Sequence, residues 1–364
     1  MNSSLRNRIG TMSLALSLLT ISSAAPMYQV IPIGDWPGAT SGTPMAINNQ
    51  NVVAGTSFGD GAAYGWVYSE QGGMSTYAFP WNNDHAYRDI NDAGQTTGYS
   101  LGWGSAIRAE SGQVFGWNTP VGYERATGWG INNLGVMAGW SISNTQGVPT
   151  RATRFNSNFT GTLLPVLNAN ANSQARRIND SGVICGISDE KAVLWTANNT
   201  LVNLHAMIPG AVESYAYDIN EAGWVTGHYV TAQNSVGEFR FNFETGMQLL
   251  PTLGQNLITR SEGINAHGET VGATRPSANS GPNVAYLRSS LGVMVDLNDC
   301  ISPSSGWQLT RATAINDNGY IAGVGVFRGV QTNFLLRPVP EPSTIVALGV
   351  GFLMTAKRRR RLKS

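Results

Sequence analysis

The chain has 364 residues, with 23 Lys and Arg, 22 Asp and Glu, 43 Gly and a charged fraction of only 12%. Single hydrophobic cores rarely grow past about 250–300 residues, so the length argues against one compact core. Two cysteines exclude a disulfide scaffold and a Cys-rich zinc cluster. The glycine content lies well above the usual ~7%, which indicates many turns and many short strands rather than long helices.

The N-terminus has the three parts of a secretory signal peptide. Arg6 and Arg8 precede an apolar run over residues 12–21, and small residues follow it. The run is too short to span a hydrocarbon core of about 30 Å. We therefore predict a signal peptide over residues 1–24, removed by signal peptidase after Ala24.

One pattern, Ile-Asn-x-x-Gly-x-x-x-Gly, recurs seven times over residues 27–338 at steps of 41–51 residues. The asparagines of the seven copies are Asn48, Asn91, Asn132, Asn179, Asn220, Asn265 and Asn316. Asn51 replaces the first glycine in the first copy. Because glycine and asparagine enter positive φ at the lowest cost, this position predicts a left-handed hairpin turn.

The segments around each turn are typical of strands. In the fifth copy, residues 214–219 precede the turn, and segments 224–230, 238–243 and 247–253 follow it. These are β-branched and aromatic runs broken by Gly, Asn and Ser, without sustained helical periodicity. Four short strands in each unit of about 40–45 residues predict propeller blades.

The two ends of the repeat region complement each other. The seventh repeat stops after its third strand, and residues 28–34 match the fourth-strand segment 247–254 almost residue for residue. We therefore predict an all-β, seven-bladed β-propeller over residues 27–338, closed by the N-terminal strand. An open β-solenoid is the alternative, although it would leave two strand edges exposed and need caps.

The C-terminal segment, residues 339–364, again has three parts. The triplet Pro340, Glu341 and Pro342 precedes a short apolar run over residues 345–356. A basic stop follows, consisting of Lys357, Arg358, Arg359, Arg360 and Arg361. The positive-inside rule keeps this basic end in the cytoplasm and exports everything before it. A permanent anchor is the alternative interpretation.

This order of parts resembles the PEP-CTERM sorting tail of Gram-negative bacteria. The resemblance implies transient insertion of a short transmembrane helix into the inner membrane, recognition by an exosortase, and passage to the cell surface or extracellular matrix. The repeats resemble the extracellular HAF-repeat family, although the histidine of its His-Ala-Phe strand is missing here, as in 192–195 and 285–288. That family implies a location and no specific reaction.

The charge is unevenly distributed. Eight of the 23 basic residues lie at the two ends and all 22 acids lie between Arg8 and Lys357, which leaves the segment between them a net charge of −7. Such a surface repels phosphate backbones, so we expect no nucleic-acid partner.

Acidic side chains in the turns raise the question of calcium. These acids are Asp92, Asp180, Glu221 and Asp317, and none has EF-hand spacing. We expect them to accept hydrogen bonds from turn amides. Calcium held by convergent loops is the alternative; otherwise we expect no metal and no cofactor.

Histidines and cysteines show no catalytic spacing. The histidines fall in different repeats, so we expect structural or solvated roles for His85, His205, His228 and His267. Cys185 and Cys300 should lie about two blades apart, beyond the ~7 Å Cα limit of a disulfide, so we expect free thiols. Pairing in an oxidising compartment is the alternative.

Aromatic residues carry the remaining functional signal. We expect Trp66 and Trp195 in the core. Four tryptophans near turns and glycines are candidates for sugar stacking: Trp103, Trp129, Trp140 and Trp224. Without a nucleophile elbow or nucleotide motif, the sequence predicts a non-catalytic binding module for exopolysaccharide or a matrix protein. A propeller hydrolase or lyase, recognised by close carboxylates of raised pKa at the central mouth, and a structural spacer are the alternatives.

Overall fold

The computed structural model describes residues 28–77, 84–102, 104–110, 113–251, 257–276 and 281–339. The predicted signal peptide, the Pro-Glu-Pro triplet, the apolar segment, the basic stop and Trp103 lie outside these residues. Within the described ranges, none of the helices has the length and apolar character needed to cross a bilayer.

The described chain is all-β, apart from three short 3-10 helices, and its strands form antiparallel groups of four that we call blades. Blade 1 consists of β2 (Ser41–Ile47), β3 (Val53–Gly59), β4 (Ala62–Ser69) and β5 (Gly73–Ser75). Blade 2 consists of β6 (His85–Ile90), β7 (Thr96–Ser100), β8 (Ala106–Glu110) and β9 (Gln113–Gly116). One parallel bridge, between Tyr64 and His85, links these two blades into a single sheet.

The next three blades are separate four-stranded sheets. Blade 3 consists of β10 (Arg125–Ile131), β11 (Met137–Ile142), β12 (Arg151–Phe155) and β13 (Gly161–Leu163). Blade 4 consists of β14 (Ser173–Ile178), β15 (Ile184–Ser188), β16 (Lys191–Trp195) and β17 (Leu201–Asn203). Blade 5 follows η1 (His205–Met207) and consists of β18 (Ala211–Ile219), β19 (Val225–Thr231), β20 (Val236–Asn242) and β21 (Gly246–Leu250).

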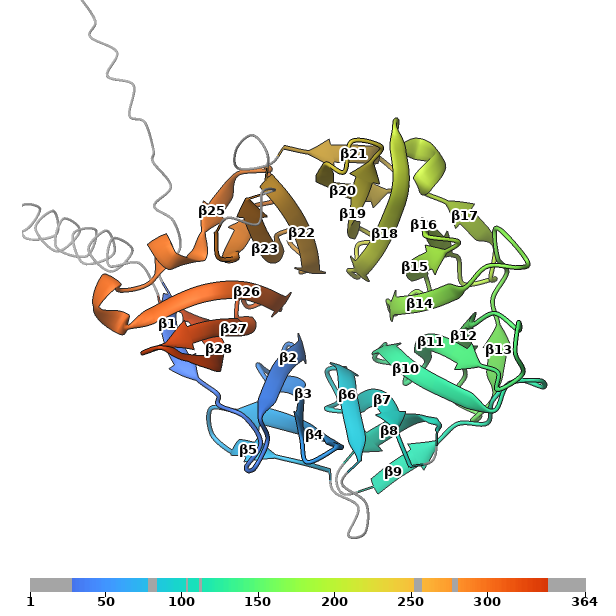
Figure 1. The fold of residues 1–364 in the computed structure, drawn as a ribbon, viewed down its shortest axis with the longest axis horizontal. Helices are drawn as coiled ribbons and strands as arrows, with labels where there is room; N and C mark the ends of the chain where they lie inside the picture. The colour runs from blue at the N-terminus through green and yellow to red at the C-terminus, as the bar shows by residue number, and fades with distance from the viewer. Residues whose placement is uncertain are drawn as a thin grey trace, which may run out of the picture.

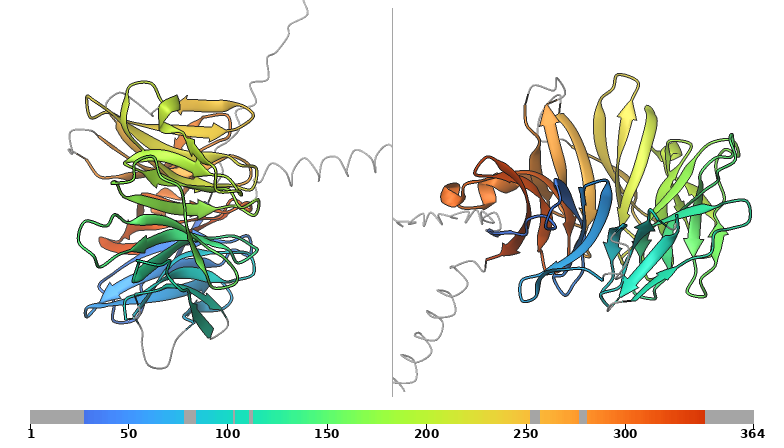
Figure 2. Two further views of the ribbon diagram at one scale, coloured as in Figure 1. Left: turned by 90° about the vertical axis from the view of Figure 1, so that its right-hand side faces the viewer. Right: turned by 60° about the horizontal axis from the view of Figure 1, so that its bottom comes forward.

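The last two blades complete the arrangement, in which the sheets stand radially around one axis (Figure 1) and form a disc when seen from the side (Figure 2). Blade 6 consists of β22 (Leu257–Ile264), β23 (Thr270–Pro276), β24 (Val284–Arg288) and β25 (Met294–Asp296). After η2 (Leu297–Cys300) and η3 (Pro303–Ser305), blade 7 consists of β26 (Trp307–Ile315), β27 (Ile321–Phe327), β28 (Val330–Pro338) and β1 (Tyr28–Pro32).

The segment at the start of the described chain belongs to the last sheet. β1 pairs antiparallel with β28, from Tyr28 opposite Pro338 to Pro32 opposite Phe334. It thereby supplies the fourth strand that the seventh repeat lacks. This pairing joins residues about 300 positions apart, so it brings the two ends of the repeat region together.

Each repeat turn has the left-handed corner that the sequence predicts. Asn51 has φ 62°, and the equivalent glycines have φ between 73° and 79°. The second glycine of the motif is required for a different reason, the close approach of a neighbouring backbone. A Cβ at Gly98 would lie 1.7 Å from the carbonyl oxygen of Ala86. The inner strand carries a β-bulge between Tyr87 and Asp89 at this point, and the bulge brings its backbone against the glycine.

The core lies between neighbouring blades. Trp66 is fully buried and packs with Val53 of blade 1 against Ala322 and Leu335 of blade 7. Trp195, also fully buried, packs in the same way at the contact of blades 3 and 4. Both tryptophans therefore occupy the core positions predicted for them.

Blades 5 and 6 meet around a buried ion pair. Arg288 Nη2 lies 2.7 Å from Glu238 Oε2, and the hydroxyl of Tyr286 donates to the other carboxylate oxygen. Burial raises the pKa of Glu238 to about 7, against the lowering effect of Arg288.

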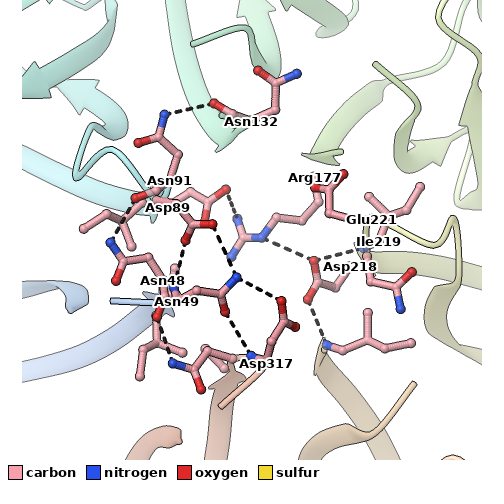
Figure 3. A pocket seen from close by; sticks show the side chains of 18 of the residues that line it. Asn48, Asn49, Asp89, Asn91, Asn132, Arg177, Asp218, Ile219, Glu221 and Asp317 are labelled. Carbon is pink, nitrogen blue, oxygen red and sulfur yellow. Dashed lines mark hydrogen bonds and ion pairs between the residues drawn. The ribbon is translucent and has the colours of Figure 1, made fainter. Parts of the chain in front are cut away.

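A ring of asparagine side chains joins the seven turns around the axis. In each turn Nδ2 donates to the backbone carbonyl of the next repeat's asparagine at 2.8–3.3 Å, and the bond from Asn316 returns to Asn48. Part of this ring is visible in Figure 3. The same side chains close their own turns, since Asn179 Oδ1 accepts from Val183 N at 2.9 Å.

We predict that Asn179→Ala lowers the free energy of unfolding by about 2–4 kcal/mol, because it leaves one buried donor and one buried acceptor without partners. The side chain is only 2% exposed. Denaturant unfolding measures the change. Exposed Asn198 of the same blade is the matched control, and Asn198→Ala should stay within about 0.5 kcal/mol of the parent. Equal losses for both variants would contradict a special role for the ring.

Candidate functional site

The seven turns surround a cavity of about 160 Å³ on the axis, which we call the turn mouth. Four of its lining residues are the turn acids singled out from the sequence. Asp92 Oδ1 accepts from the backbone N–H of Asn49 at 2.8 Å, and Asp317 Oδ1 accepts from that of Ala266 at 2.7 Å. Asp180 and Glu221 bind backbone amides of the preceding repeats in the same way.

These acids accept hydrogen bonds from turn amides, but each amide belongs to the turn of the neighbouring repeat rather than to the acid's own turn. The asparagine of each turn already accepts from the amides of its own turn, as Asn48 does from Gln50 N and Val52 N. Convergence of the turns on one axis places each acid beside the neighbouring turn instead. Among the residues that the structure describes, no group of three or more His, Cys, Asp and Glu side chains has the geometry to hold a metal ion.

Arg177 lines the turn mouth, and its side chain reaches between Asp89 and Asp218 (Figure 3). Its guanidinium lies 3.9 Å from Asp89 Oδ2 and 3.7 Å from Asp218 Oδ1. It also donates to the carbonyls of Trp129 at 2.5 Å and Met45 at 3.2 Å. One side chain of blade 4 thus contacts blades 1, 2, 3 and 5, and it lines both the turn mouth and the neighbouring channel cavity of about 100 Å³.

The two carboxylates beside Arg177 are held by backbone amides as well. Asp89 Oδ2 accepts from Ile131 N, and Asp218 Oδ2 accepts from Ile264 N, both at 2.9 Å. Burial raises the pKa of both side chains, to about 6 for Asp218, although Arg177 opposes the rise.

The opposite end of the channel, which we call the arginine mouth, is built from residues at the bulges of the inner strands. The guanidinium of Arg176 lies 4.7 Å from the ring centre of Tyr217 and 5.6 Å from that of Trp129. The guanidinium of Arg88 also covers Trp129, at 4.6 Å from its ring centre. The ring centres of Trp129 and Trp140 lie 4.9 Å apart. Each bulge turns the residue two positions before the repeat isoleucine toward the channel.

A larger cavity of about 420 Å³ opens beside this mouth at blade 6. Arg260, Arg275 and Arg311 line it together with Tyr217 and Glu262. Arg311 forms a two-point ion pair with Glu262, at 2.6 and 2.7 Å. Within the described residues neither Arg260 nor Arg275 has a hydrogen bond or an ion pair. The cavity therefore presents two arginines that no carboxylate of the described chain neutralises.

His228 is buried next to Tyr217, one of the residues that line this cavity. Its ring stacks against Tyr215 at 5.0 Å and Tyr217 at 5.2 Å. Burial, with Arg260 and Arg176 nearby, lowers the pKa of His228 to about 3. The imidazole is therefore neutral at physiological pH and acts as a packing element between two tyrosines.

The structure brings together only part of the predicted sugar-stacking set. Trp129 and Trp140 contact each other at the arginine mouth. Trp224 follows the fifth turn, where its backbone N–H donates to Asn220 Oδ1 and Arg240 covers its ring at 4.9 Å. It thus belongs to the turn side of the molecule. The channel arginines were missed by the sequence analysis, although their regular offsets before the repeat isoleucines were a usable signal.

The other histidines and the cysteines have structural surroundings. His205 Nδ1 lies 2.9 Å from Ser214 Oγ, and His267 Nε2 lies 3.0 Å from the carbonyl of Asp317. His85 is buried at the start of β6. Cys185 and Cys300 are free and buried, and burial raises the pKa of their thiols to about 12 and 11.

Comparison with known sequences identifies one motif. The PEP-CTERM protein-sorting motif matches residues 338–361, so the chain carries a PEP-CTERM sorting motif at its C-terminus. No curated protein matches the chain.

Solved structures resemble the described domain in fold. A streptogramin B lyase is 10% identical, with 86% of this chain and 98% of that chain covered and a TM-score of 0.57. Virginiamycin B lyase from Staphylococcus aureus is 11% identical, with 85% and 99% covered and a TM-score of 0.55. A puromycin hydrolase is 13% identical, with 85% and 55% covered and a TM-score of 0.57. At such identities the likeness shows an all-β, propeller-like fold alone.

We predict that the stability of this protein falls as the pH rises from 4 to 7, by roughly 2–3 kcal/mol from Asp218 alone. The folded chain raises the pKa of this carboxyl from 3.8 to about 6, so it binds its proton more tightly than the unfolded chain does. The contribution is present below pH 3.8 and is lost as the pH passes 6. Unfolding midpoints at each pH measure it. Asp218→Asn should flatten the dependence of the unfolding midpoint on pH, whereas Asp60→Asn at an exposed position should not. An unchanged pH dependence in Asp218→Asn would contradict the assignment to Asp218.

Proposed function

We propose that this chain is an exported surface or extracellular-matrix protein whose propeller binds exopolysaccharide without catalysis. The PEP-CTERM motif supports the route: it marks a substrate of exosortase and a protein sorted to the cell surface. In this proposal signal peptidase removes residues 1–24, and residues 339–364 hold the protein briefly in the inner membrane. The HAF-type resemblance of the repeats agrees with an extracellular location.

The proposal includes a seven-bladed propeller closed by its N-terminal strand. Three observations support closure rather than an open solenoid: β1 pairs with β28, Trp66 packs against blade 7, and Asn316 donates to the carbonyl of Asn48 at 2.8 Å. A closed ring removes the free sheet edges that a solenoid would have to cap.

One observation carries the saccharide assignment. The arginine mouth places Trp129 and Tyr217 in the lining of a channel cavity of about 100 Å³, and Tyr217 also lines the adjoining cavity of about 420 Å³, which is within the size range of small-molecule sites. Aromatic rings offer an apolar face to the C–H surface of a sugar, and neighbouring polar groups bind its hydroxyls. The arrangement fits a sugar unit of an extracellular polymer better than a flat protein partner.

The carboxylates support binding rather than catalysis. Asp89 and Asp218 have the raised pKa values that a hydrolase acid needs. However, both face Arg177 and each accepts from a backbone amide, so their oxygens are engaged in holding the channel. We assign them to the structure of the axis. A hydrolase or lyase remains the second candidate because of the raised pKa values, and release of reducing or unsaturated ends, abolished by Asp218→Asn, would establish it.

Sorting gives the first prediction from this proposal. In the native host the protein should be found at the surface or in the medium, shortened at both ends. In a strain without exosortase it should accumulate in the inner-membrane fraction with its C-terminal tail intact. Fractionation with an antibody against the propeller measures this. A full-length cytoplasmic protein in both strains would contradict export.

The binding site gives the second prediction. Trp129→Ala should lower retention of the protein on exopolysaccharide from the host by about tenfold, because it removes the aromatic surface at the mouth. Retention on a column of immobilised polymer measures it. Trp224→Ala is the matched control, because Trp224 is also covered by an arginine but lies on the turn side of the molecule. Retention of the Trp224→Ala variant should match that of the parent protein. Equal losses in both variants would remove the arginine mouth as the site.

A further inference from the structure

We propose that the cavity of blade 6 recognises the carboxylate of an acidic sugar unit, so that the polymer bound is a uronic-acid-containing polysaccharide. The inference deepens the proposed saccharide function and rests on it. It is carried by Arg260 and Arg275, which line the cavity of about 420 Å³ without partners among the described residues.

The two arginines are placed side by side by the sheet. In the register of β22 and β23, Ile258 lies opposite Arg275 and Arg260 lies opposite Ala273. Arg260 and Arg275 are therefore diagonal neighbours on one face, about 7–8 Å apart at the backbone. Like charges in such positions repel each other, and an anion between them converts this repulsion into attraction.

The other charged residues near the cavity do not neutralise the positive charge of Arg260 and Arg275. Glu262 is the acid that lines the cavity, and Arg311 binds both of its oxygens through Nε and Nη2. Arg176, next to Tyr217, adds a further guanidinium whose Nε has no hydrogen-bond partner among the described residues. The cavity and its rim therefore carry an excess of positive charge on a domain that is acidic as a whole.

A carboxylate fits these donors better than a neutral hydroxyl does. Arginine presents paired N–H groups in a planar fork that matches the two oxygens of a carboxylate. Tyr217, whose ring is stacked against His228 and covered by Arg176, lines the cavity at its border with the channel. Asn283 at the rim offers an amide for sugar hydroxyls.

The turn mouth shows the contrast. There Asp92, Asp180, Glu221 and Asp317 surround the axis, and their side chains are bound to backbone amides. The two ends of the channel thus have opposite charge. An acidic polymer is attracted to the arginine mouth and repelled from the turn mouth, which restricts it to one face of the disc.

The test compares three polymers of defined charge on the purified exported protein. The probes are polygalacturonate, neutral dextran and dextran sulfate, and affinity is measured by calorimetry at low and at high salt. We expect polygalacturonate to bind more tightly than dextran and to weaken as salt is added. The double variant Arg260→Gln, Arg275→Gln should bind polygalacturonate at least tenfold more weakly. Its thermal unfolding midpoint should not fall, because the substitution removes a repulsion.

Arg240→Gln is the matched control, because Arg240 covers an aromatic ring on the turn side and should leave the affinity unchanged. Equal affinity for dextran and polygalacturonate, with no loss in the double variant, overturns the carboxylate inference and leaves saccharide binding in place. Tighter binding of dextran sulfate with the same arginine dependence assigns the site to sulfate and overturns it as well. Failure of all three probes, and of host exopolysaccharide, overturns the proposed function itself.

Discussion

The side-chain amides of the repeat asparagines are the interaction on which the rest of this structure depends. Each donates to the carbonyl of the next turn while its own oxygen closes the turn it belongs to, as Asn179 does with Asn220 and Val183. A buried amide with both ends engaged cannot be replaced by an apolar residue without leaving backbone groups unpaired. The ring thus fixes where every inner strand ends, and therefore how closely the blades approach the axis.

The position of the inner strands decides the chemistry of the channel. Each inner strand has a bulge just before its turn, such as that between Ala216 and Asp218. The bulged residue, here Tyr217, is directed toward the arginine mouth rather than the turn mouth. One end consequently collects acids that bind neighbouring amides, and the other collects Arg176, Tyr217 and Trp129. Arg177 stands between them and contacts four other blades. The same constraint that closes the turns therefore separates two mouths of opposite charge.

Much of the fold was predictable because it depends on residue types within short segments of the chain. A left-handed corner requires glycine or asparagine, and Asn51 in place of glycine identified that corner without any structure. Pairing of β1 with β28 was predictable from the likeness between two fourth-strand segments. The role of the acids was not predictable, since the partner of Asp92 is the amide of Asn49, 43 residues away. Trp129 and Trp224 both lie near turns in the sequence, and only the blade geometry places them on opposite sides.

The sequence by itself determined the repeat, the strand-rich class and the sorting tail, because each of these depends on residue types within a short stretch of chain. The tertiary structure decided which side chains share a cavity. Arg260 and Arg275 are separated by a turn, Tyr217 belongs to another blade, and their juxtaposition follows from strand register and from the angle between blades. Charge complementarity at a site is a property of distances between residues far apart in the chain, and those distances are set only when neighbouring blades have packed together.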